Sequence, residues 1–260
     1  MPIIKEIAGQ LKLRESQVKS AVELLDGGNT IPFIARYRKE ATGELDENAL
    51  RAIEEKLAYL RNLAQRKEEV IRLVAEQGKL SPELEQAIAA AKILQEVEDL
   101  YRPYRQKRRT RATMAKEKGL EPLALIILAQ EVQAGDPFEY AAAYVNNELG
   151  VGSAEEALAG AKDIVAEIIS DDAQVRKKLR EFFFARGILT VTAAKGNEVS
   201  PYEMYYNYSE PLGKVPPHRV LAINRGEREE FLSVKIEVPA EVGEIVLRPY
   251  VKGGIFAPFV

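Results

Sequence analysis

The segment between Arg102 and Lys118 concentrates side chains suited to binding an anion. It reads RPYRQKRRTRATMAKEK and holds eight Lys or Arg residues and one Glu, a net charge of +7. The whole chain carries −3, so the remaining residues sum to −10. Because cations contact phosphates and planar rings stack on bases, arginines mixed with Tyr101 and Tyr104 predict contact with a flexible nucleic-acid strand. The predicted contact residues are Arg102, Arg105, Lys107, Arg108, Arg109 and Arg111.

A structural interpretation of the same segment stays open beside the functional one. Acidic residues precede the segment at Glu96, Glu98 and Asp99, and a helix is expected to end near Leu100. These carboxylates and the negative end of the helix would neutralise the cations. The tyrosines would then pack inward, and the segment would be a structural turn.

A smaller cationic cluster lies at Arg36, Arg38 and Lys39, with Tyr37 among them. It would suit a phosphate-binding patch with an aromatic platform. The glutamates of the helix that follows offer the alternative, in which the three cations form ion pairs. We expect the ion pairs and retain the three residues as candidate nucleic-acid contacts.

Side chains that perform catalysis or hold metals are scarce. The chain has no Cys, and its single His, His218, would need converging partners to act as a base or a ligand. Asp171 and Asp172 stand where a helix starts, so we expect capping rather than a magnesium site. The phosphate-cradling pattern GxxxxGK[ST] does not occur in the sequence. We therefore expect no enzyme, no cofactor and no metal.

The composition is that of an ordinary soluble globular protein. Of 260 residues, 46% are hydrophobic and 30% are charged, enough for one large domain or two small ones. The start, MPIIKEIAGQLKLRE, lacks the apolar core of a signal peptide. No stretch approaches the roughly eighteen apolar residues of a membrane span. We expect a cytoplasmic location and no membrane partner.

The stretch from Asp46 to Gly78 predicts one long helix that the other elements must be arranged around. Asp46 suits its N-cap and Gly78 its end. Eight positions spaced alternately three and four apart form a seam on one face: Leu50, Ile53, Leu57, Leu60, Ala64, Lys67, Ile71 and Val74. Ala64 and Lys67 are poor knobs for a two-stranded coiled coil. We therefore expect the chain's own helices to cover the seam, and a monomer; an intermolecular coiled coil is the alternative.

Residues 3–11 and 15–25 predict two short helices with a tight turn, a start that resembles a helix-turn-helix. Glu15, Glu23 and Asp26 on the second helix oppose phosphate contact, so a plain helical hairpin is favoured over groove binding.

Further helices are expected to about residue 187, where the composition changes. Residues 188–193 are β-prone, and 199–218 are rich in Tyr and Pro. Residues 219–224 and 231–238 alternate apolar and polar side chains around Arg225-Gly226-Glu227, which predicts a β-hairpin. Residues 245–247 would add a strand. The expected fold is mainly α: a multi-helix domain over 1–187, followed by a small α+β segment over 188–260.

Three long strings resemble the N-terminal region of the Tex (YhgF-like) family of transcription accessory proteins. They are IPFIARYRKEATGELDE at 31–47, EDLYRPYRQKRRTRATMAKEKGLEPLA at 98–124 and HRVLAINRGEREEFL at 218–232. The resemblance covers essentially 1–238. It implies that 1–187 is a Tex-type helical domain and that 188–260 leads toward an RNase H-like domain. Family members are much longer and also carry helix-hairpin-helix modules and a C-terminal S1 domain, their main RNA-binding element.

The resemblance implies a role near transcription for an N-terminal part of such a protein. Its implied partners are nucleic acid, RNA or DNA, bound mainly through the other family domains, and the transcription machinery. The first functional hypothesis is a non-catalytic scaffold with accessory phosphate contacts. The alternative is a protein-interaction module that docks other domains or transcription partners without binding nucleic acid.

Overall fold

The structure, a computed structural model, describes residues 2–106, 108–194, 199–239 and 241–260. The chain divides into two compact units, residues 1–101 and 102–260. The boundary expected from sequence at residue 187 lies inside the second unit, where helices give way to strands, and it stays a prediction about domain structure. The expected mainly α fold with a small α+β segment is confirmed.

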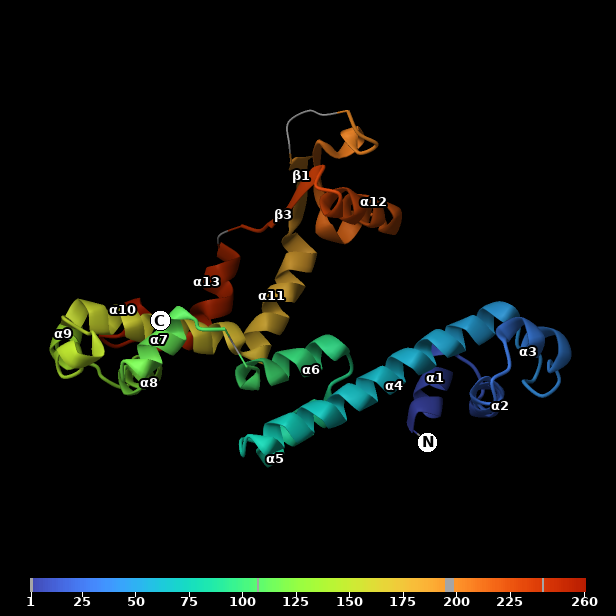
Figure 1. The fold of residues 1–260 in the computed structure, drawn as a ribbon, viewed down its shortest axis with the longest axis horizontal. Helices are drawn as coiled ribbons and strands as arrows, with labels where there is room; N and C mark the ends of the chain where they lie inside the picture. The colour runs from blue at the N-terminus through green and yellow to red at the C-terminus, as the bar shows by residue number, and fades with distance from the viewer. Residues whose placement is uncertain (1, 107, 195–198, 240) are drawn as a thin grey trace. The chain divides into compact units, whose positions relative to one another are not determined.

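The first unit is built around one long helix, α4 (Figure 1). Three short helices precede it and two follow it, and all five pack against it. The elements are α1 (Pro2–Leu11), α2 (Glu15–Asp26), α3 (Ile31–Tyr37), α4 (Glu47–Glu76), α5 (Pro82–Ala90) and α6 (Leu94–Tyr101). The two predicted N-terminal helices are thus present as α1 and α2.

Helix α4 has the limits that the sequence predicts. The Asp46 carboxylate accepts a hydrogen bond from the Ala49 N–H at 2.7 Å, and Gly78 has a φ of +67°. The buried face starts as expected with Leu50, Ile53, Leu57 and Leu60. Thirty residues at about 1.5 Å each make a rod of about 45 Å.

Farther along α4 the buried face departs from the expected seam. Leu63 and Val70 are buried, whereas Ala64 and Ile71 are only half-buried. A straight helix has about 3.6 residues per turn, so a seam with a 3.5-residue period drifts around it. Lys67 is half-buried, and its Nζ donates a hydrogen bond to the Ala89 carbonyl at 2.7 Å, near the end of α5.

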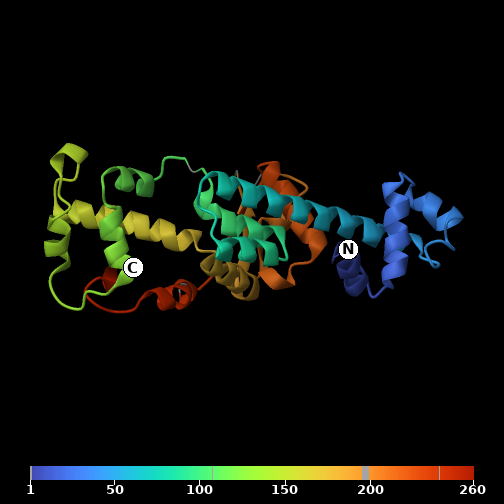
Figure 2. The same cartoon turned by 90° about the horizontal axis from the view of Figure 1, so that it is seen from below.

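The second unit has a helical body centred on α10, whose neighbours α7, α8, α9 and α11 all pack against it (Figure 2). The body comprises η1 (Arg102–Tyr104), α7 (Arg111–Glu117), α8 (Glu121–Ala129), α9 (Pro137–Ala142), η2 (Asn147–Leu149), α10 (Ala154–Asp171) and α11 (Ala173–Arg186). Its core includes Leu123, Ile127 and Ile164, and Phe256 from the end of the chain joins them.

A three-stranded antiparallel sheet with the order β2-β1-β3 follows α11 (Figure 1). Helix α12 packs against β3, and α13 packs against α11. The elements are β1 (Ile188–Ala193), η3 (Glu203–Tyr205), β2 (Asn207–Pro211), η4 (Leu212–Lys214), α12 (Pro217–Arg228), β3 (Leu232–Glu237), α13 (Glu241–Leu247), η5 (Arg248–Tyr250) and η6 (Ala257–Phe259). Val191 lies opposite Tyr208 on one side and Val234 on the other.

The predicted hairpin at Arg225-Gly226-Glu227 is wrong. Its second strand exists as β3, but residues 219–224 and Gly226 belong to helix α12. Gly226 is needed for packing: a Cβ there would lie 2.6 Å from Leu232 Cδ1 and 3.0 Å from Tyr202 Cδ1. The glycine therefore marks a close approach of helix and strand, where the sequence suggested a turn.

The strand expected at residues 245–247 is also wrong, because these residues end helix α13. Val242 and Val246 are both buried, and a spacing of four places them on one helical face. Within the described residues, no helix combines the length and apolar character needed to cross a membrane.

Candidate nucleic-acid interface

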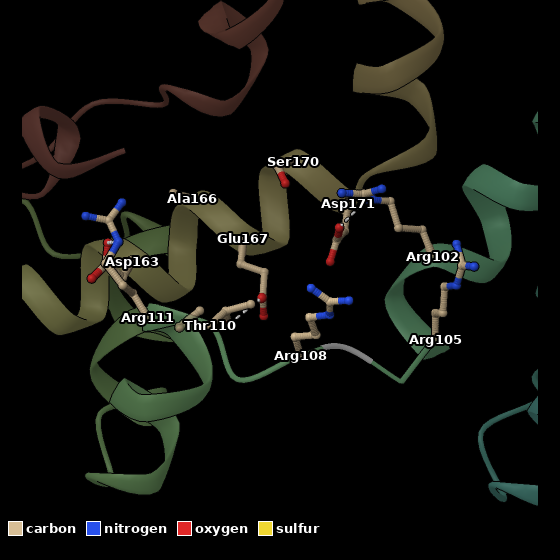
Figure 3. Close-up of a pocket in the computed structure, with 11 residues that line it drawn as sticks. Arg102, Arg105, Arg108, Thr110, Arg111, Asp163, Ala166, Glu167, Ser170 and Asp171 are labelled. Atoms are coloured by element: carbon tan, nitrogen blue, oxygen red, sulfur yellow. Dashed lines mark hydrogen bonds and ion pairs between the residues drawn. The ribbon is translucent and has the colours of Figure 1, made fainter. Parts of the chain in front are cut away.

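The predicted basic segment lies alongside helix α10 (Figure 3). Arg102 lies in η1, and Arg111 opens α7, where the Thr110 hydroxyl caps the helix by accepting from the Thr113 N–H at 3.0 Å. Lys107, another predicted contact residue, lies outside the described residues.

Three acidic residues of α10 hold this segment. Asp163, Glu167 and Asp171 are spaced four apart, which places them on one helical face. Arg102 Nε lies 2.8 Å from Asp171 Oδ1, the Thr110 hydroxyl donates to Glu167 Oε1 at 3.0 Å, and Arg111 Nε lies 3.5 Å from Asp163 Oδ1. Because the partners appear in reverse order along the chain, the segment runs antiparallel to α10.

A groove of about 530 Å³ lies between the segment and α10. Arg105 and Arg108 line it together with the small residues Ala166 and Ser170 of α10. Neither arginine forms an ion pair with any carboxylate in the described part of the chain. Figure 3 shows Arg108 pointing from the segment toward α10. The groove thus presents cationic groups between the anchored residues Arg102 and Arg111.

The acidic partners of Arg102, Arg109 and Arg111 differ from those that the structural interpretation named. Arg109 pairs with Glu117 at 2.8 Å, and Arg102 and Arg111 pair with α10. Among the acidic residues preceding the segment, Glu98 instead forms an ion pair with Arg66 at 2.6 Å. Hydrogen bonds to Glu98 and then Glu69 raise the pKa of Arg66 above its ordinary value.

The two tyrosines of the basic region are half-buried. The Arg66 guanidinium lies over the Tyr101 ring, 5.5 Å from its centroid, so that ring is already engaged inside the first unit. Tyr104 also has an interaction partner. The contact of Arg66 with the Tyr101 ring is thus a packing role of the kind that the structural interpretation expects.

The cations of the second predicted cluster are exposed at the end of α3. Arg36, Arg38 and Lys39 form no ion pair with a described carboxylate, so the ion pairs expected from sequence are wrong. One reason is local: Glu47, the first residue of α4, pairs with Arg51 one turn later in its own helix.

An aromatic pair accompanies these cations, and together they form the α3 patch: Phe33, Arg36, Tyr37, Arg38 and Lys39. The Phe33 and Tyr37 ring centroids lie 5.3 Å apart, and the Arg38 guanidinium lies 5.8 Å from the Phe33 centroid. Tyr37 is 64% exposed. Phe33 was not among the residues predicted from sequence, although its helical spacing of four from Tyr37 predicts the contact.

Hydrogen bonds hold the loop that follows the α3 patch. The buried Thr42 hydroxyl donates to the Lys39 carbonyl at 3.0 Å. Gln17 Nε2, from α2, donates to the Gly43 carbonyl at 2.8 Å. The patch is therefore presented by an ordered backbone.

The residues considered for catalysis or metal binding are His218, Asp171 and Asp172, and the structure places each of them in a different environment. His218 is exposed near the start of α12. Asp172 caps α11, as expected, by accepting from the Gln174 and Val175 N–H groups. Asp171 is instead the buried partner of Arg102, a role that the sequence did not indicate. The described residues contain no group of three His, Cys, Asp or Glu side chains placed to hold a metal ion.

Comparison with known proteins gives two family matches. Residues 1–75 match the Tex-like protein N-terminal domain, and residues 133–252 match the Tex central region. "Protein tex" of Bordetella pertussis is 46% identical over 242 residues, which cover 92% of this chain and 30% of that protein.

Two further relatives extend the comparison. "Transcriptional accessory protein Tex" of Neisseria gonorrhoeae is 40% identical, across 91% of this chain and 31% of its own length. "S1 RNA-binding domain-containing protein 1" of Homo sapiens is 30% identical, across 84% of this chain and 22% of its own length. The chain thus spans a third or less of these curated relatives. With matches to both Tex regions, the chain belongs to the Tex family and contains its N-terminal domain and central region.

Proposed function

We propose that this chain is a non-catalytic scaffold of a nucleic-acid-associated transcription accessory protein, with exposed cations that contact the phosphate backbone. The names of its relatives, a transcriptional accessory protein and a protein with an S1 RNA-binding domain, support the proposed association with transcription and nucleic acid.

The observation that carries this proposal is the α3 patch. Three exposed cations without a described carboxylate partner are free to meet phosphates, and the exposed Tyr37 ring offers a surface for stacking. Because ordered backbone presents the patch, binding would order few backbone torsions, and its entropic cost would come mainly from the side chains.

A salt series with the chain and a labelled single-stranded oligonucleotide tests the proposal. If the three cations of the α3 patch contact phosphates of the single strand, affinity should fall roughly twentyfold between about 50 and about 200 mM salt. The variant Arg36→Gln/Arg38→Gln/Lys39→Gln should weaken binding and flatten the salt dependence.

A matched control removes the same charge elsewhere in the first unit. Arg51, Arg72 and Lys79 are exposed, and the variant Arg51→Gln/Arg72→Gln/Lys79→Gln should bind almost as well as the native chain. Equal losses in both triple variants would reduce the effect to net charge and refute a role for the α3 patch.

The protein-interaction module remains the second candidate, favoured by large exposed apolar side chains in the second unit. Phe184, Met204 and Leu221 are 67%, 75% and 71% exposed. Absence of oligonucleotide binding at low salt would favour this function over the first.

We also propose that the chain is a monomer. The buried face of α4 is covered by helices of its own unit, which leaves no open seam for a coiled coil. Light scattering should give the mass of one chain, and a dimer at micromolar concentration would contradict this proposal.

A further inference from the structure

We propose that the groove between the basic segment and α10 is a phosphate-binding site centred on Arg105 and Arg108. The phosphate belongs either to a nucleic-acid strand or to a free phosphorylated small molecule. Only the first source rests on the function proposed above.

The anchoring contacts shape the site. Arg102 and Arg111 pair with Asp171 and Asp163, eight residues apart on α10, so these two positions of the segment contact one helical face. Arg105 and Arg108 lie between Arg102 and Arg111 along the chain and form no ion pair with a described carboxylate, although they share the groove with those of α10. Because residues on both sides of them are anchored, binding an anion here would cost less backbone entropy than binding it with a free loop.

The opposite wall leaves room for a ligand. Ala166 and Ser170 are exposed on α10 and have short side chains, and the volume of about 530 Å³ is within the range of small-ligand pockets. The Ser170 hydroxyl adds a hydrogen-bond donor to this wall. A phosphate group placed here would accept hydrogen bonds from both sides.

The charges of the described groove lining favour a compact anion. Four arginines, Arg102, Arg105, Arg108 and Arg111, face three carboxylates, which leaves one positive charge in excess. Guanidinium groups match phosphate oxygens with paired hydrogen bonds. Asp163 and Asp171 would repel a duplex backbone laid along the helix, whereas Glu167, which lies between them, is engaged by the Thr110 hydroxyl and by Lys116. The site therefore suits one or two phosphate groups rather than the face of a duplex.

Calorimetric titration of the full chain with inorganic pyrophosphate tests the site. Arg105→Gln/Arg108→Gln should lower the affinity at least about tenfold, because charge-assisted hydrogen bonds are lost. Both arginines are exposed, so the fold should survive. Arg51→Gln/Arg72→Gln removes the same charge from α4 and should change the affinity less than about twofold.

A second variant acts from the opposite wall. Ala166→Glu/Ser170→Glu adds carboxylates at exposed helical positions, where they would occupy the groove and pair with Arg105 and Arg108. It should abolish pyrophosphate binding while circular dichroism and the melting temperature stay native-like. Binding that survives both groove variants would overturn the proposal, as would equal losses in the α4 control.

A short oligonucleotide with a 5′-hydroxyl end distinguishes the two sources of phosphate. If the oligonucleotide binds and the groove variants weaken that binding, the site is supported with strand phosphate as its ligand, even if pyrophosphate does not bind. If the groove variants weaken pyrophosphate binding and the oligonucleotide does not bind at all, the site is supported and the proposed nucleic-acid scaffold function is refuted. If neither probe binds the native chain, the groove is not a phosphate site.

Discussion

Arg102 Nε donates to the Asp171 carboxylate across 2.8 Å, although 69 residues separate the two in sequence. The Asp171 side chain is 7% exposed and that of Arg102 is 46% exposed. The contact fixes the start of the basic segment against the end of α10, and so defines one end of the groove.

A double-mutant cycle on this pair should reveal a favourable coupling. Arg102→Gln, Asp171→Asn and the double variant should give about 1 kcal/mol, because one partner is desolvated while the other keeps contact with water. Chemical denaturation measures the free energies. The same cycle on Arg72 and Glu76, which are exposed and 3.8 Å apart, should give a value near zero. Equal coupling free energies in the two cycles would show that the burial of Asp171 does not strengthen its ion pair.

Gly226→Ala should destabilise the second unit by about 1–3 kcal/mol, because the new methyl group would overlap Leu232 and Tyr202. Gly243→Ala, in helix α13, meets no atom within 4 Å and should instead stabilise by up to about 1 kcal/mol. Melting curves of the two variants should shift in opposite directions. A stabilising Gly226→Ala would contradict the close packing of α12 against β3.

Leu57→Ala should destabilise the first unit by about 2–5 kcal/mol, since Leu57 is 6% exposed in the buried face of α4. Glu54→Ala, at an exposed position in the same helix, serves as the control and should leave the melting temperature nearly unchanged. An unchanged melting temperature for Leu57→Ala would mean that this face of α4 is not part of the core.

Tyr250 should make stability depend on pH in the alkaline range. Burial, followed by the charge of Asp172 and a hydrogen bond to it, raises the pKa of Tyr250 to about 12. The folded chain therefore holds this proton more tightly than the unfolded chain, whose tyrosine pKa is about 10. The stabilisation is complete below about pH 10 and is lost as pH rises toward 12, with a slope of up to about 1.4 kcal/mol per pH unit.

Denaturant unfolding at several pH values should show a shallower decline for Tyr250→Phe than for the native chain. Tyr37→Phe removes an exposed hydroxyl and should keep the native slope. Equal slopes in all three proteins would show that Tyr250 titrates alike in the folded and unfolded states.

Local patterns in the sequence were sufficient to predict most helices. The long helix α4, its Asp46 cap and the Asp172 cap of α11 follow from side-chain type and position along the chain. The strands at 188–193 and 232–237 also agree with local β-propensity. The hairpin prediction for the α12 region failed because a glycine within an alternating pattern has two explanations, a turn or a close approach of two elements. Only the position of Leu232 distinguishes them.

The sequence by itself determined the Tex resemblance, the charge of the basic segment and the cationic cluster at 36–39. Tertiary structure decided which of those cations are neutralised. Arg102 and Arg111 are paired because packing brings α10 beside them, whereas Arg105, Arg108 and the α3 cations form no ion pair with a described carboxylate. Ion pairing requires contact within a few ångströms, and the spacing of charges along a chain does not specify which distant helix face will supply it.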